Sequence, residues 1–171
     1  MASRGWLAAL LLLLSSLTAR AEEAWRADLS QSALWRAQTS WQANPAATAS
    51  LLADADGLRL RVTEPGRGMK WLTGSAELTD LELFPYLVVT YTASGVAANT
   101  DYLLWAGGDG GGDGVRLLRG ADVLADGQPH TVAFDLPELG LREPVDRLAV
   151  GLAAEQAEAR VQISSLYQTD Q

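Results

Sequence analysis

The residues Leu58-Arg59-Leu60-Arg61-Val62 alternate between apolar and basic side chains. Successive side chains of a β-strand point to opposite faces, so this pattern predicts a strand that buries its leucines and its valine against a core. A second run, Tyr86–Thr92, is rich in β-branched and aromatic residues. Such a composition is typical of a central strand with both faces covered. The two runs together favour an all-β fold.

Further strand-like segments continue this pattern toward the end of the chain and are separated by turn residues. They cover residues 69–73, 102–106, 115–119, 130–136, 147–153 and 160–167. Short strands joined by turns are typical of an antiparallel sandwich or barrel and not of alternating βαβ units. The one helix-like stretch, Ala24–Ala37, also fits an N-terminal strand and loop that pack against the sheets, which we favour for its later part.

The first residues have the features of a secretory signal. Arg4 supplies a positive charge, Leu7–Leu14 is an unbroken apolar run, and Ala19 and Ala21 are the small residues that precede a cleavage site. The apolar run is shorter than the roughly 20 residues that cross a membrane. We therefore predict a signal peptide over residues 1–21, no membrane insertion, and export to the periplasm or the extracellular space.

The remaining residues, 22–171, are expected to form one domain, because about 150 residues is an ordinary domain length. The chain contains no cysteine, so it has neither a disulfide framework nor a cysteine for a lipid anchor. Its formal net charge is −8, and removal of Arg4 and Arg20 with the signal makes the domain more acidic. This charge argues against nucleic acid and anionic membranes as partners.

The passage Asp126-Gly127-Gln128-Pro129-His130-Thr131, followed by a strand that ends at Asp135-Leu136, resembles a recurrent turn and strand of galactose-binding-like and carbohydrate-binding-module jelly rolls. Residues 78–89 resemble the entry into a central strand of that family, and residues 145–148 and 161–166 resemble its final strand pair. The resemblance covers residues 50–168, and Pro129 stands where the family usually has an aromatic residue. It implies an antiparallel jelly-roll β-sandwich of one domain that binds a glycan.

Histidine-centred catalysis has little support, because His130 is the only histidine and cysteine is absent. The same count excludes metal sites that need two or three histidines. His130 shares the parity of Val132 and Phe134, which we expect to point inward. We therefore predict a hydrogen-bonded histidine at the rim of the core.

A pair of carboxylates for glycoside hydrolysis is the more serious enzymatic alternative. The densest acidic cluster is Glu77, Asp80 and Glu82. Glu77 has the opposite parity to the other two, so the three do not share one strand face. We predict a protein that is not an enzyme, with no catalytic residues.

The glycine-rich segment 107–114 joins two predicted strands and indicates a hairpin with a solvated tip. It lacks the Lys-Ser/Thr ending of a phosphate-binding loop. Asp109 and Asp113 are candidate calcium ligands, although calcium needs six to eight oxygens and other loops would have to contribute. We expect no cofactor and keep a structural calcium ion as the alternative.

Exposed aromatic rings are the usual means of binding a sugar, because the apolar face of the sugar ring packs on them. Trp71, Tyr102 and Trp105 are the candidate ligand-binding residues. By parity Tyr102 shares a strand face with Leu104, and Trp105 shares the other face with Leu103. The pattern therefore predicts that either Tyr102 or Trp105 points away from the core.

Three functions are consistent with these observations. The first is an exported, non-catalytic carbohydrate-binding module whose partner is a polysaccharide or other glycan. The second is a structural or protein-interaction sandwich of the cell envelope that docks an exported protein, and it predicts an exposed apolar patch. The third is a glycan-active enzyme that uses the acidic cluster.

Overall fold

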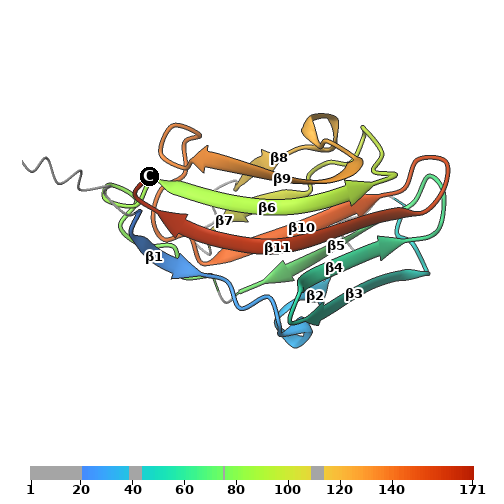
Figure 1. Ribbon diagram of the computed structural model, residues 1–171, viewed down its shortest axis with the longest axis horizontal. Helices are drawn as coiled ribbons and strands as arrows, with labels where there is room; N and C mark the ends of the chain where they lie inside the picture. Colours follow the sequence, from blue (N-terminus) through green and yellow to red (C-terminus); the bar gives the residue numbers. More distant parts are fainter. Residues whose placement is uncertain (1–20, 39–43, 75, 109–113) are drawn as a thin grey trace, which may run out of the picture.

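The computed structural model describes residues 21–38, 44–74, 76–108 and 114–171. Two antiparallel β-sheets pack face to face, and their long strands curve across the molecule as two layers (Figure 1). The predicted antiparallel β-sandwich is confirmed. Residues 1–20 lie outside the described part, so the signal peptide stays a prediction. No helix of the described residues is long and apolar enough to cross a membrane.

The first sheet has the strand order β3-β4-β11-β6-β9, and β1 also pairs with β11. Its strands are β1 (Glu23–Arg26), β3 (Ala49–Asp54), β4 (Gly57–Val62), β6 (Tyr86–Ser94), β9 (Asp126–Asp135) and β11 (Ala159–Thr169).

The second sheet has the order β2-β5-β10-β7-β8. Its strands are β2 (Arg36–Ala37), β5 (Gly68–Thr73), β7 (Leu104–Gly107), β8 (Val115–Leu118) and β10 (Arg147–Ala153). From β4 onward the chain passes back and forth between the two sheets, as in a jelly roll. The predicted hairpin is the antiparallel pair β7 and β8.

The core lies between the sheets and follows the alternation seen in the sequence. On β4 the side chains of Leu58, Leu60 and Val62 are buried, while the arginines between them are exposed. On the second sheet the buried residues include Trp71 of β5 and Val150 of β10, which lie opposite each other. Each large apolar side chain buried in this way contributes roughly 1.5–3 kcal/mol to folding.

The N-terminal stretch forms a strand, a short 3-10 turn at Ser32–Leu34 and a second strand, as favoured over a helix. The strand β3, by contrast, was not predicted. Its residues are mostly alanine and leucine without strict alternation, and it lies at a sheet edge where pairing with β4 stabilises it.

Two further expectations need adjustment. Residues 126–129 were predicted as a turn, but Asp126 and Pro129 pair with Ser94 and Thr92 of β6 across a bulge. Proline has no backbone N–H to donate to a neighbouring strand. It is tolerated at position 129 because β9 is an edge strand. The strand β6 is central, as predicted, yet its outer face is only partly covered, with Thr90 half-buried.

Candidate ligand-binding face

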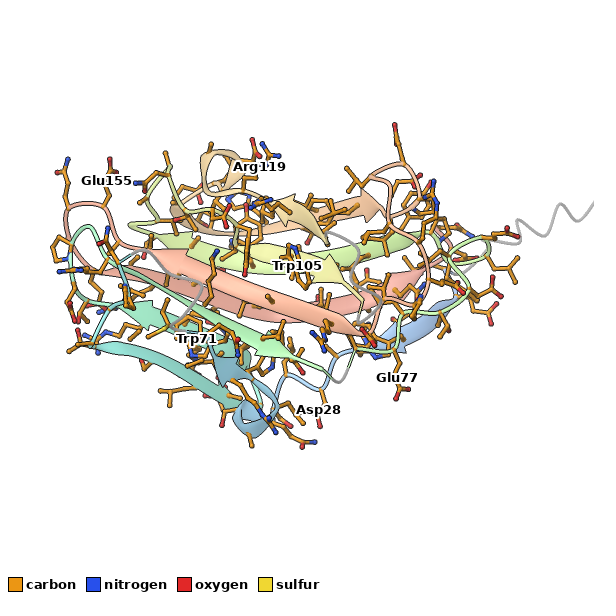
Figure 2. All side chains as sticks on the ribbon, turned by 180° about the vertical axis from the view of Figure 1, so that it is seen from behind. Asp28, Trp71, Glu77, Trp105, Arg119 and Glu155 are labelled. Atoms are coloured by element: carbon orange, nitrogen blue, oxygen red, sulfur yellow. The ribbon has the colours of Figure 1, made fainter. Side chains whose placement is uncertain are left out.

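The outer surface of the second sheet, on the side away from the core, is called the β10 face. The strand register determines which side chains lie on it, because the core residues of each strand alternate with outward ones. The outward strand residues are Arg36, Gly68, Lys70, Leu72, Trp105, Gly107, Arg116, Arg147, Ala149, Gly151 and Ala153. Figure 2 is seen from the side of this sheet and places Trp105 on it.

The central strand β10 carries only small side chains on the middle of this face, namely Ala149, Gly151 and Ala153. Gly151 is required by a close approach, since a Cβ there would lie 2.6 Å from the carbonyl oxygen of Tyr102. A groove of about 300 Å³ runs along this end of β10. It is lined by Asn44, Gly66, Arg67, Gly68, Lys70, Asn99, Thr100, Asp101, Tyr102, Gly151, Leu152, Ala153 and Ala154.

Trp105 lies flat against the sheet beside this groove. A Cβ on Gly107 would lie 2.4 Å from the indole Cη2, and one on Gly114 would lie 1.9 Å from Cζ2. The two glycines thus leave the space in which the ring rests. Trp105 is half-buried and is not part of the apolar core formed by the described residues. The ring therefore has a supported face toward the sheet and a partly exposed remainder.

Tyr102 lies on the same side of the sheet as Trp105, contrary to the prediction that only one of them points outward. Leu103 and Leu104 are both buried in the core, and the pairing of β7 with β8 shifts register between Leu104 and Trp105. This irregularity breaks the strict alternation on which the parity argument depended. Both aromatic rings consequently belong to the β10 face.

An ion-pair network joins the groove to the tryptophan. Lys70 Nζ donates to Asp101 Oδ2 at 2.6 Å, and Arg116 Nε donates to Asp101 Oδ1 at 2.5 Å. Lys70 Nζ also lies 4.4 Å from the centre of the Tyr102 ring, within the range of a cation-π contact. Arg116 pairs with Trp105 across the strands. One carboxylate thereby holds two cations that lie beside the two aromatic rings.

The charges of the network alter the acidities of its members. Burial raises the pKa of the Asp101 carboxyl, but hydrogen bonds from Arg116 and Lys70 outweigh this effect and hold its pKa below the ordinary value. Asp101 is therefore a carboxylate at neutral pH. Burial, and then the charge of Asp101, raise the pKa of the Tyr102 hydroxyl, which stays protonated.

The Tyr102 hydroxyl is a buried polar atom that has no hydrogen-bond partner among the residues that the structure describes, while the residue as a whole is 4% exposed and lines the groove. A buried hydroxyl that lacks a partner costs free energy, and such exceptions in folded proteins call for an explanation.

The third predicted ligand residue, Trp71, lies elsewhere. It is 5% exposed and belongs to the core, on the inward side of β5 between the sheets. A ligand on the β10 face does not reach it, so the candidate set narrows to Tyr102 and Trp105. The predicted calcium ligands Asp109 and Asp113 lie outside the described residues, and the calcium alternative stays a prediction. Among the described residues no group of three or more His, Cys, Asp or Glu side chains could hold a metal ion.

The single histidine has the structural role expected of it. His130 Nε2 and Asp126 Oδ1 are 2.8 Å apart, and the imidazole lies 5.8 Å from the Tyr91 ring. The hydrogen bond from His130 holds the pKa of Asp126 below its ordinary value. His130 therefore connects β9 to β6 at the rim of the core.

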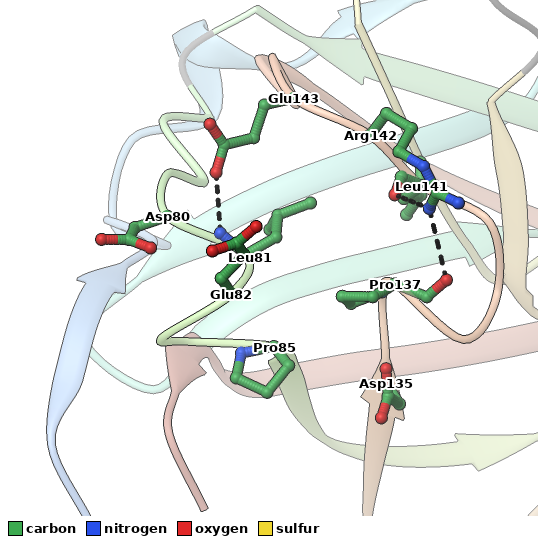
Figure 3. Close-up of a pocket in the computed structure, with 9 residues that line it drawn as sticks. All are labelled: Asp80, Leu81, Glu82, Pro85, Asp135, Pro137, Leu141, Arg142 and Glu143. Carbon is green, nitrogen blue, oxygen red and sulfur yellow. Dashed lines mark hydrogen bonds between the residues drawn. The ribbon is translucent and has the colours of Figure 1, made fainter.

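The acidic cluster borders a larger pocket at one end of the sandwich (Figure 3). The pocket has a volume of about 870 Å³ and is lined by Asp80, Leu81, Glu82, Pro85, Asp135, Pro137, Leu141, Arg142 and Glu143. Glu77 is separate from it and lines a smaller pocket beside Trp25. The expectation that Glu77 does not share a face with Asp80 and Glu82 agrees with this arrangement.

The charged groups of this end pocket hold loops in place. Glu143 Oε1 accepts a hydrogen bond from the Leu81 backbone N–H at 2.7 Å, and Arg142 Nη1 donates to the Leu141 carbonyl at 2.8 Å. Figure 3 shows Asp80 turned away from Asp135. Asp80 Oδ1 also accepts a hydrogen bond from the Leu83 backbone N–H at 3.3 Å, so Asp80 and Glu143 both support the turn at residues 80–83.

Comparison with known proteins gives similarities in fold only. No family model and no curated protein matches the chain. A solved structure of the xylan-binding module CBM15 is similar at a TM-score of 0.48 and 17% identity, over 84% of this chain and 94% of that chain. A mutant Xylanase10C from Cellvibrio japonicus in complex with xylopentaose is similar at a TM-score of 0.43 and 16% identity, over 84% of this chain and 28% of that chain.

Three residues of the β10 face were not predicted as site residues from the sequence, namely Lys70, Asp101 and Arg116. A signal for Lys70 was present, because it stands between Met69 and Trp71 in a strand and must point away from the core that they enter. Asp101 and Arg116 meet only through the pairing of β7 with β8. No sequence spacing indicates that contact.

Proposed function

We propose that this chain is an exported, non-catalytic carbohydrate-binding module, and that the β10 face is its binding surface. The observation that carries the proposal is the indole of Trp105, which rests on Gly107 and Gly114 beside a polar groove. An aromatic ring held flat on a sheet offers the apolar surface on which a sugar ring stacks. Neighbouring hydrogen-bonding groups then fix the sugar hydroxyls.

The groove supplies such groups next to the ring. Asn99, Asp101 and Tyr102 line it from one side, and Lys70 lines it from the other. A combination of one stacking ring and several convergent polar groups is the usual composition of a sugar site.

Affinity electrophoresis and isothermal titration against a panel of polysaccharides test the proposal. We expect binding to at least one glycan, and we expect Trp105→Ala to weaken it at least tenfold, as removal of a central aromatic contact does. Tyr167→Ala is the matched control, because Tyr167 is a half-buried aromatic residue on β11 of the opposite sheet. Absence of binding to every glycan, or equal affinities for wild type and Trp105→Ala, would overturn the proposal.

The proposed absence of catalytic activity is tested separately. Incubation with each bound glycan is expected to leave its chain length unchanged in size-exclusion chromatography. Should shortened products appear, Asp80→Asn combined with Glu82→Gln distinguishes an active site in the end pocket from a contaminant. The protein-interaction alternative predicts an exposed apolar patch, and the most exposed large apolar residues of the described chain are Leu52, Leu83, Leu124 and Leu139.

A further inference from the structure

We propose that the protein has a second ligand site, separate from the β10 face, that takes a small organic cation. The site is a pocket of about 230 Å³, which we call the N-terminal pocket. It lies where the chain passes from β1, in the first sheet, to β2, in the second. The pocket is lined by Trp25, Arg26, Ala27, Asp28, Leu34, Trp35, Thr73, Glu77 and Leu148.

Two tryptophans give this pocket an aromatic lining. Trp25 of β1 is half-buried, and Trp35, directly before β2, is 7% exposed. Leu148 of β10 is a core residue and also lines the pocket, so the pocket reaches the core of the sandwich. The face of an indole ring attracts a cation because the ring quadrupole is negative there, and tryptophan is the strongest of the aromatic side chains in this respect.

Two carboxylates beside the indoles lack a cationic partner. Asp28 and Glu77 are exposed and form no ion pair with any residue that the structure describes. Figure 2 shows both at the same edge of the sandwich, away from Trp105. Arg26 also lines the pocket, but its guanidinium is paired with Glu23 at 2.5 Å and 2.8 Å. The lining therefore keeps a negative charge that a cation would balance.

The hydrogen bonds of Asp28 indicate which kind of cation fits best. The Ser30 hydroxyl and backbone N–H donate to Asp28 Oδ1 at 2.5 and 3.0 Å, and the Gln31 amide donates to Oδ2. These bonds hold the pKa of Asp28 below its ordinary value, so it is charged at neutral pH. They also occupy most of its acceptor positions without neutralising it. A quaternary ammonium group needs an aromatic face and a negative charge but no hydrogen-bond acceptor, so it suits this pocket best.

The size of the N-terminal pocket limits the ligand to a compact group. Sites for drug-sized molecules have volumes of about 300–1,000 Å³, and this pocket is smaller, at about 230 Å³. Water screens the exposed carboxylates and weakens their attraction for a cation. We therefore expect a single ammonium head group to bind with millimolar affinity.

Isothermal titration with choline and with tetramethylammonium tests the inference. The matched ligand control is the neutral analogue of choline in which a carbon replaces the ammonium nitrogen. We expect both cations to bind and the neutral analogue to bind at least tenfold more weakly, because it has the same shape without the charge. Glu77→Gln should weaken choline binding about fivefold, the order expected for one exposed charge contact. Glu155→Gln is the control variant, because it removes the same charge from an exposed loop.

Two substitutions of Trp25 test the role of the ring. Trp25→Leu removes the aromatic face and should weaken choline binding more than Trp25→Phe, which keeps a smaller one. Trp25 packs against the core, so urea denaturation of both variants establishes that they are folded under the conditions of the titration.

The outcomes separate this site from the proposed glycan site. Trp105→Ala should leave choline affinity unchanged, and Glu77→Gln should leave glycan affinity unchanged. Equal binding of choline and its neutral analogue, or no binding of either cation, would overturn the cation site and leave the glycan proposal intact. Unchanged choline affinity in Glu77→Gln and Trp25→Leu, or its loss in Trp105→Ala, would overturn the assignment to the N-terminal pocket.

Discussion

Trp71 and Trp105 have the same side chain and different surroundings. Trp71 points into the core between the sheets, whereas Trp105 lies on the outer surface over two glycines. Burial of a large aromatic ring stabilises the fold, and a ring held at the surface contributes contact area to a ligand. Substitution of Trp71 should therefore mainly lower the stability of the fold, whereas substitution of Trp105 should mainly weaken ligand binding.

Trp71→Ala is expected to lower the free energy of unfolding by about 3–5 kcal/mol, the usual cost of removing a buried tryptophan. Trp105→Ala should cost about 1 kcal/mol, in keeping with an ordinary partly exposed site. Urea denaturation followed by circular dichroism measures both values. Equal losses of stability would contradict the distinction between a core ring and a surface ring.

Gly107→Ala tests the support beneath the ring. A Cβ at this position would lie 2.4 Å from the Trp105 indole, so the ring must move off the sheet. We expect glycan affinity to fall about tenfold, since a stacking contact depends on ring orientation, while stability changes by only about 1 kcal/mol. Gly74→Ala is the control, because nothing lies within 4 Å of a Cβ there. Unchanged affinity in Gly107→Ala would show that the position of the ring does not matter.

At the scale of the strands, the alternation of side chains along the sequence indicated which face of a strand is buried wherever the strand register is regular. It predicted the buried face of β4 and of β10 correctly. It was wrong at Tyr102 and Trp105, because the irregularity at Leu104 places two successive leucines in the core and both rings outside. It also missed β3, whose stability comes from pairing with β4 and not from its own composition. Contacts between strands decided each of these cases.

The arginine pair around Glu158 joins β4 and β11 and should make stability depend on pH. Hydrogen bonds from Arg160 and Arg61 lower the pKa of Glu158 from 4.5 to about 2. A carboxyl whose pKa is depressed in the folded state stabilises that state above the unfolded pKa. This contribution is complete above pH 4.5 and is lost as the pH falls toward 2.

Glu158→Gln should consequently be less stable than wild type at neutral pH, and the difference should shrink between pH 4.5 and pH 2. Chemical denaturation at several pH values measures the difference. Glu155→Gln, an exposed residue of the preceding loop, is the control and should follow the wild-type pH dependence. A deficit of Glu158→Gln that is the same at every pH would rule out the ion pair as its cause.

For the whole molecule, the fold class was predictable from the sequence, and Tyr102 and Trp105 stay candidate ligand-binding residues. The charged residues around them were not predictable, because Lys70, Asp101 and Arg116 come from separate segments that meet only after the sheet forms. A net charge of −8 describes the sum of all residues, whereas a ligand meets one face. The grouping of these side chains on the β10 face therefore appears only once the strands are placed.

The two ends of the described chain meet, and this contact bears on the predicted signal cleavage. The Glu22 backbone nitrogen donates to Asp170 Oδ1 at 2.8 Å, beside the pairing of β1 with β11 (Figure 1). Cleavage after Ala21 would turn this nitrogen into a charged α-amino group. The existing hydrogen bond would then become an ion pair, which at an exposed site stabilises by up to about 1 kcal/mol.

We therefore expect the exported protein to begin at Glu22, as measured by intact mass. In the protein that starts at Glu22, Asp170→Asn should lower Tm by about 1–4 °C. In a version that keeps Ala21, the Glu22 nitrogen remains an amide, and the same substitution should have a smaller effect. A different N-terminus would refute the predicted cleavage site. Equal effects of Asp170→Asn in the two versions would refute the ion pair, because the hydrogen bond alone would then account for the contact between the chain ends.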